Sequence, residues 1–163
     1  MKKIHYLICV SAIALTTQSC QNEANYKDVR KEVITLHDGL MASDERLMST
    51  KMALDSLCLT GMPGVKAHYL EVDTGELRTE VKLLTERLNN LSDQMSNWME
   101  NFKTDMDGKS NAEAVAYFEA EKVKVKRLDS LYNAAITESE NYLKRFDIKR
   151  DTTAKHEHSM HNM

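Results

Sequence analysis

The most regular hydrophobic pattern in the chain lies between residues 70 and 102. Apolar side chains recur there in alternating steps of four and three residues, with one polar member: Leu70, Thr74, Leu77, Val81, Leu84, Leu88, Leu91, Met95, Trp98 and Phe102. This is the heptad spacing of a helix that packs along one apolar stripe. Because one helix cannot bury such a stripe alone, the pattern predicts long partner helices elsewhere in the chain.

The start of this helix is marked by Asp73. Asp73 can cap a helix, Glu76 follows three residues later as in a capping box, and Val72 and Leu77 occupy the positions of a hydrophobic staple. We therefore expect the helix to run from Asp73 to about residue 102, with residues 65–72 as a connector or a short turn.

A first helix is predicted from Asn25 or Lys27 to Leu59. Its main stripe is Tyr26, Val29, Val33, Leu36, Leu40, Leu47, Leu54 and Leu57, with gaps at Ser43 and Thr50. A second stripe beside it, expected to widen the buried face, is Ile34, His37, Met41, Met48 and Met52. The segment Thr60-Gly61-Met62-Pro63-Gly64 holds strong helix breakers, so we expect the helix to end before it.

A third helix is predicted from the capping box of Ser110 and Glu113 to Phe146. Its weaker stripe is Phe118, Val125, Leu128, Tyr132, Ala135, Tyr142 and Phe146, interrupted by Glu121 and Ser139 and flanked by Leu131, Ile136 and Leu143. With one proline, five glycines and 6% aromatic residues, the chain offers few signals for strands. These features predict an all-α, antiparallel up-down-up three-helix bundle with coiled-coil-like seams over residues 28–146.

The N-terminal segment has the zones of a lipoprotein signal peptide. Basic residues precede an apolar run from Ile4 to Leu15, which is too short for a permanent membrane span. Ser19-Cys20 then resembles a bacterial lipobox, which predicts a signal peptide over residues 1–19, acylation of Cys20 and a lipidated tether over residues 20–27. An ordinary signal peptide with a chance cysteine, or an uncleaved anchor, is the alternative.

Charge and cysteine usage fit an exported protein. Cleavage before Cys20 would remove two of the 22 basic side chains and none of the 25 acidic ones, leaving a net charge of −5. No basic stripe is present, so we expect no nucleic-acid partner. Cys58 would be the single free thiol of the mature chain, with no intramolecular partner. We interpret it as a small packed side chain.

Catalytic motifs do not emerge from the sequence. It holds no Gly-x-Ser-x-Gly elbow and no phosphate-binding glycine loop. Asp105-x-Asp107-Gly108 resembles the middle of a calcium loop, but both end positions lack carboxylates, so we interpret it as an acidic turn with Gly108 left-handed. We therefore expect a protein that is not an enzyme.

Soft-metal binding is the one candidate chemistry. His37 and Met41 lie one helical turn apart, and Met95, Met99 and Met106 form a second group of donors around Trp98. Thioether and imidazole groups in an oxidising compartment suit copper, above all copper(I). The alternative is that these methionines fill gaps in the core and that His37 is a hydrogen-bonded core residue.

The C-terminal segment, residues 147–163, lacks an apolar period and is predicted to be a disordered, flexible tail. It carries five further donors: His156, His158, Met160, His161 and Met163. Such a tract can chelate copper, nickel or zinc without a fold, or serve as a solvated tail that titrates near neutral pH.

Several motifs together resemble a family of small lipoproteins from Bacteroidetes-type bacteria, commonly labelled "viral A-type inclusion protein". The motifs are His37-Asp38-x-x-Met41, Trp98-Met99-x-Asn101-Phe102, Met106-Asp107-Gly108 and Ala116-Tyr117, within residues 29–146. The resemblance implies an anchored helical lipoprotein without an assigned activity.

Two functional hypotheses follow from the sequence. The first is a non-enzymatic lipoprotein of the bacterial cell envelope, anchored through Cys20 at the outer membrane, without a cofactor and with an unknown protein partner. The second is an envelope protein that binds or handles copper through the His and Met donors named above.

Overall fold

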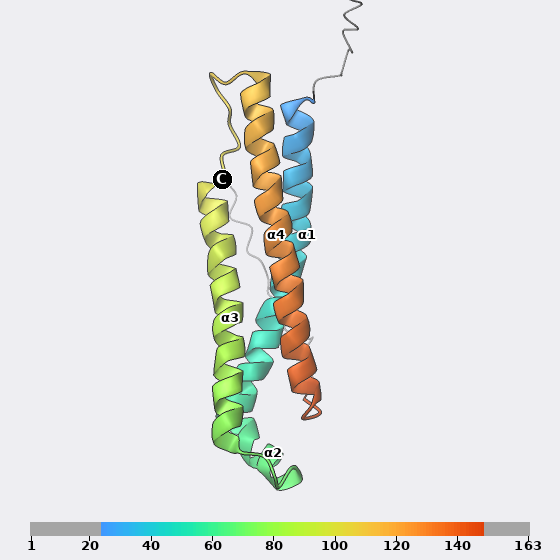
Figure 1. Ribbon diagram of the computed structural model, residues 1–163, viewed down its shortest axis with the longest axis vertical. Helices are drawn as coiled ribbons and strands as arrows, with labels where there is room; N and C mark the ends of the chain where they lie inside the picture. The colour runs from blue at the N-terminus through green and yellow to red at the C-terminus, as the bar shows by residue number, and fades with distance from the viewer. Residues whose placement is uncertain (1–23, 149–163) are drawn as a thin grey trace, which may run out of the picture.

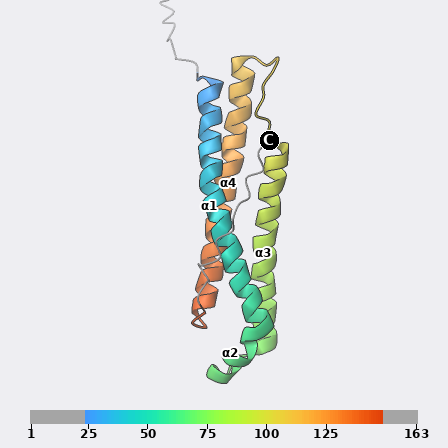
Figure 2. The same cartoon turned by 180° about the vertical axis from the view of Figure 1, so that it is seen from behind.

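The protein is a rod of three long helices. The computed structural model describes residues 24–148, in which α1 (Tyr26–Ser56), α3 (Thr74–Asn101) and α4 (Asn111–Lys144) form the bundle. Helix α1 runs down, α3 returns beside it and α4 runs down again, so α1 and α4 are parallel and α3 is antiparallel to both (Figure 1). Figure 2 shows the same arrangement from behind. The predicted all-α, up-down-up bundle is confirmed.

Helix starts follow the capping signals in the sequence. The Asn25 side chain accepts a hydrogen bond from the Lys27 amide at the start of α1. The Asp73 carboxylate accepts from the Gly75 amide at 2.7 Å, so Gly75 lies in the first turn of α3 as predicted. Ser110 and Glu113 form the predicted capping box of α4. Each cap satisfies amide groups that have no partner inside the helix.

The predicted break at residues 60–64 is wrong. The helical backbone continues from α1 through a π-helical segment, η1 (Leu57–Gly61), into α2 (Met62–His68), and the chain turns only at residues 69–73. Pro63 is the second residue of α2 and directly follows the π-helical segment, so its missing amide hydrogen leaves one hydrogen bond of the continuing helix unmade. Met62 and Val65 are buried in the core, and their burial outweighs the flexibility of the two glycines.

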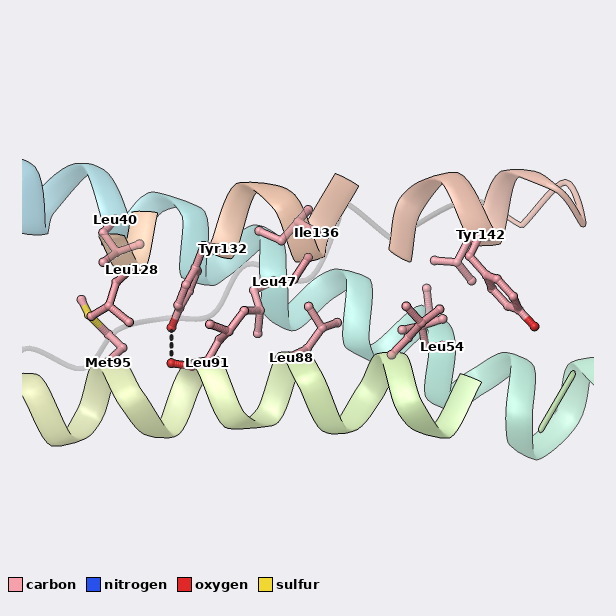
Figure 3. Close-up of a cluster of buried hydrophobic side chains, with 14 of the residues drawn as sticks. Leu40, Leu47, Leu54, Leu88, Leu91, Met95, Leu128, Tyr132, Ile136 and Tyr142 are labelled. Carbon is pink, nitrogen blue, oxygen red and sulfur yellow. Dashed lines mark hydrogen bonds between the residues drawn. The ribbon is translucent and has the colours of Figure 1, made fainter. Parts of the chain in front are cut away.

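The core is formed by the predicted heptad stripes. Leu47, Leu88, Tyr132 and Ile136 have no exposed surface, and Figure 3 shows side chains of all three helices meeting along the axis. Polar residues in the stripes are also buried. The Thr50 hydroxyl donates to the Arg46 carbonyl at 2.8 Å, which satisfies it within its own helix.

The second stripe of the first helix is not the buried face that the sequence predicts. Ile34, Met48 and Met52 are exposed, while His37 and Met41 are half-buried. In a three-helix bundle each helix has two neighbours, and the main stripe already faces both of them. Burial of a second stripe would require a further helix against α1.

The predicted domain limits need small changes. Tyr26 stacks on Phe118 of α4 at a ring-centroid distance of 6.2 Å, so the bundle begins inside the predicted tether. At the other end, Ile148 is half-buried against the core and extends the bundle beyond residue 146.

None of the helices within residues 24–148 has the length and apolarity needed to cross a membrane.

Candidate functional site

Aromatic side chains gather where α3 ends and α4 begins. Trp98 stacks on Phe102 with 4.8 Å between ring centroids, and Phe102 lies edge-on to Phe118 at 6.0 Å. Tyr117 packs against Phe118 at 5.1 Å, and its hydroxyl accepts a hydrogen bond from the Lys103 amide at the start of the loop. Rings from α3, α4 and the start of the loop therefore pack against one another and hold this end of the bundle together.

A buried carboxylate lies at the centre of this end. Glu121 occupies a core position of α4 and is only 5% exposed. Its Oε2 accepts a hydrogen bond from Trp98 Nε1 at 2.8 Å, and its Oε1 is 2.7 Å from Lys124 Nζ. Both carboxylate oxygens are therefore satisfied, as a buried charge requires.

In the sequence, Glu121 stands out only as an interruption of the heptad stripe, so its place in this site was not predicted. The position of Glu121 could have predicted a buried hydrogen bond, because an acidic residue at a heptad core position must find a donor in the bundle. The single tryptophan of the chain, at a core position of the neighbouring helix, was a natural candidate for that donor.

His37 lies against Trp98 and joins α1 to the aromatic end. The two ring centroids are 5.6 Å apart, and the His37 side chain is 24% exposed. Its Nδ1 is 3.3 Å from the Asp38 carboxylate on the same helix. The ring is therefore packed on one side and open to solvent on another.

The methionines of the soft-metal hypothesis occupy different environments. Met95 is buried in the core among α1 and α4 side chains (Figure 3), whereas Met99, one turn later, is 41% exposed. Met41 and Met106 are half-buried and pack against the core. The structure brings His37 and α3 together, but it divides the sulfur donors of α3 between the core and the surface.

Within residues 24–148, no group of three or more His, Cys, Asp or Glu side chains is arranged to hold a metal ion. Thioether sulfurs are not among these groups, so copper binding through methionines stays a prediction. The other predicted site residues lie outside the described residues: the lipidation site Cys20 and the tail donors His156, His158, Met160, His161 and Met163.

The loop between α3 and α4 fits the interpretation as an acidic turn. Gly108 has a φ of 75°, the left-handed conformation predicted for it. The Asp107 amide donates to the Asp105 carboxylate at 3.0 Å. A hydrogen bond between the two carboxyl groups, and then their charge repulsion, raises the pKa of Asp107.

A groove opens beside Trp98 between α3 and α4, with a volume of about 450 Å³. Its polar side chains are Gln94, Asn97, Asn101, Glu121, Lys124 and Arg127. A second groove of about 470 Å³ lies between α1 and α4 and includes Lys122 and Lys126. The first groove adjoins the buried carboxylate and the tryptophan, so it combines charged, amide and aromatic groups in one place.

Comparisons of the chain with protein-family models, curated proteins and solved structures found no match.

Proposed function

We propose that this protein is a non-enzymatic, lipid-anchored lipoprotein of the bacterial cell envelope, whose helical bundle stands off the membrane and contacts a protein partner. The feature that carries the proposal is the short separation in sequence between Cys20 and the start of the bundle. Only residues 21–25 separate the predicted acylated cysteine from the first residue of α1. The six steps from Cys20 to Tyr26 span at most about 22 Å.

The short tether has a geometric consequence. The start of α1 lies at the same end of the rod as the start of α4, because the Asn111 side chain accepts from the Tyr26 amide and donates to the Ala24 carbonyl. A lipid on Cys20 would hold this end close to the membrane. The far end would then stand away from it by the length of α4, about 50 Å for 34 residues.

The exposed faces of the rod support a role in contact with a partner. Polar and charged side chains cover most of the surface, and ion pairs such as Arg46 with Glu140 join α1 to α4. The bundle therefore supplies a rigid spacer, and its loops and exposed helix faces supply the surface for a partner.

The test compares two cysteine variants in cells. We expect Cys20→Ser to move the protein from the membrane fraction to the soluble fraction, because multiple acyl chains on the cysteine are what hold it. Cys58→Ser is the matched control and should leave the protein in the outer-membrane fraction. Retention of Cys20→Ser in the membrane would contradict the proposal.

A further inference from the structure

The groove between α3 and α4 has an unusual wall of amide side chains. Gln94, Asn97 and Asn101 follow one another on α3 in steps of three and four residues and line the same groove. Asn101 is the last residue of α3, whereas Asn97 lies inside the helix, where asparagine is a poor helix former and helix stability does not account for its use. Charged residues such as Glu or Lys would stabilise the helix better there.

Two of these amides hold each other in place. Asn101 Nδ2 donates to the Asn97 carbonyl at 2.7 Å and to Asn97 Oδ1 at 3.1 Å. Within residues 24–148, Asn97 Nδ2 and Asn101 Oδ1 have no hydrogen-bond partner. The wall thus presents oriented donors and acceptors to whatever enters the groove, at a reduced cost in side-chain entropy.

The opposite wall, on α4, carries a positive charge that the protein does not neutralise. Lys124 pairs with Glu121, whose second oxygen is satisfied by Trp98. Arg127 is exposed in the same groove and makes no hydrogen bond or ion pair with any residue in the range 24–148. This exposed guanidinium leaves a positive charge in the groove with which an anion could pair.

We propose that this groove binds a sugar acid, a carbohydrate unit that carries a carboxylate. The guanidinium of Arg127 matches a carboxylate through two parallel hydrogen bonds. The amides of Asn97 and Asn101 both donate and accept, as sugar hydroxyls do. The volume of about 450 Å³ lies within the range of small-ligand sites. This proposal does not depend on the lipid anchor.

A peptide helix is the competing occupant, and the groove suits it less well. Recognition of an amphipathic helix needs apolar pockets at regular intervals. Leu131, which is 38% exposed, is the one exposed apolar side chain of this groove, while Trp98 and Leu128 are buried. The other exposed side chains of the groove end in amide, ammonium or guanidinium groups, which can bond to the hydroxyl groups of a ligand.

The experiment uses the indole N–H resonance of Trp98 in the full ¹⁵N-labelled chain. The chain has one tryptophan, so this signal needs no assignment, and its N–H donates to Glu121 at the edge of the groove. Glucuronic, galacturonic and N-acetylneuraminic acids are titrated separately, with glucose and galactose as neutral counterparts. We expect a saturable shift with a Kd of about 1 mM for at least one acid, and at least about tenfold weaker binding of the neutral sugars.

Charge-matched variants locate the binding site. Arg127→Ala should weaken binding of the acid by at least about tenfold, and Arg127→Lys should give an intermediate loss because it keeps the charge but not the guanidinium fork. Lys126→Ala removes the same charge one residue earlier, in the other groove, and should leave the Kd within about twofold.

Three results would overturn the proposal. They are the absence of a saturable shift with any of the three acids up to about 50 mM, equal binding of the acids and the neutral sugars, and equal losses in Arg127→Ala and Lys126→Ala. A saturable shift with triglutamate but with none of the sugar acids would assign the groove to acidic peptides instead.

Discussion

The hydrogen bond between Trp98 and Glu121 gives the sharpest test of how the aromatic end is held together. Trp98→Phe keeps an aromatic ring at the position but removes the indole N–H, so Glu121 Oε2 loses its donor at 2.8 Å. A hydrogen bond to a charged group is worth about 1.5–3 kcal/mol, and the smaller ring leaves some unfilled space. We expect Trp98→Phe to lower the free energy of unfolding by about 3 kcal/mol.

The double-mutant cycle with Glu121→Leu separates the hydrogen bond from packing. Glu121→Leu alone leaves the indole N–H buried without an acceptor, at a cost of about 1–3 kcal/mol, but it adds an apolar side chain to the core. In Trp98→Phe/Glu121→Leu neither polar group remains. The double variant should therefore be more stable than the sum of the single losses predicts, by about 2 kcal/mol.

The assay is urea unfolding followed by circular dichroism at the helix band, because the fluorescent residue is removed in two of the variants. Glu121→Gln is the control that keeps an acceptor for the indole, so it should lose less than Trp98→Phe does. A loss below about 0.5 kcal/mol for Trp98→Phe, or additive losses in the cycle, would refute the reasoning.

Three further predictions concern other parts of the chain. Burial, and then the nearby charge of Asp44, raises the pKa of Tyr132. The contribution of Tyr132 to stability is therefore complete below the pKa of about 10 that it has in the unfolded chain, and it is lost as the pH rises above that value. In urea titrations, Tyr132→Phe should lose less stability between about pH 9 and 11 than the native chain does, and an equal loss would contradict this. Gly108→Ala should destabilise the protein by about 1 kcal/mol because residue 108 has a left-handed φ. Gly39→Ala, in open space on α1, should stabilise it by about 0.5–1 kcal/mol. Urea midpoints of the two variants equal to that of the native chain would be inconsistent with both predictions. The soft-metal hypothesis predicts that one equivalent of copper(I) quenches Trp98 fluorescence with a sub-micromolar Kd in a chain shortened to residue 148. His37→Ala should abolish this quenching. A titration in which copper(I) does not quench the fluorescence of the shortened chain would reject the hypothesis.

The long heptad stripes made the three helices predictable. On α3 the core positions from Leu77 to Trp98 are all buried, and Leu70, which keeps the same phase, is an exposed connector residue as expected. Capping residues also identified the starts of α3 and α4, because a cap is a local interaction that needs only neighbouring residues. Local rules therefore set most of the secondary structure.

The incorrect structural predictions arise where contacts between residues far apart in the sequence override a local rule. Glycine and proline near residue 63 predict a break, but burial of Met62 and Val65 keeps the backbone helical. The exposure of Met48 and Met52 depends on how many helices surround α1, which the pattern on α1 cannot determine. Contacts between helices therefore decide where a local pattern fails.

The candidate site was predicted in part. The end of α3 near Trp98 was identified from its density of aromatic and sulfur side chains, and the structure places His37 against it. The partnership with Glu121 and the groove beside Arg127 were not predicted, because they depend on the rotation of α4 relative to α3. A heptad pattern defines the inner face of each helix but not which outer residues of two helices meet.

The most direct test of the proposed function is the mass of the N-terminal peptide of the mature protein, purified from the membrane fraction of cells that carry the native chain. The proposal predicts that this peptide begins at Cys20 and carries the added mass of a lipid. A peptide that contains residues 1–19, or an unmodified Cys20 in the membrane-bound protein, would contradict it.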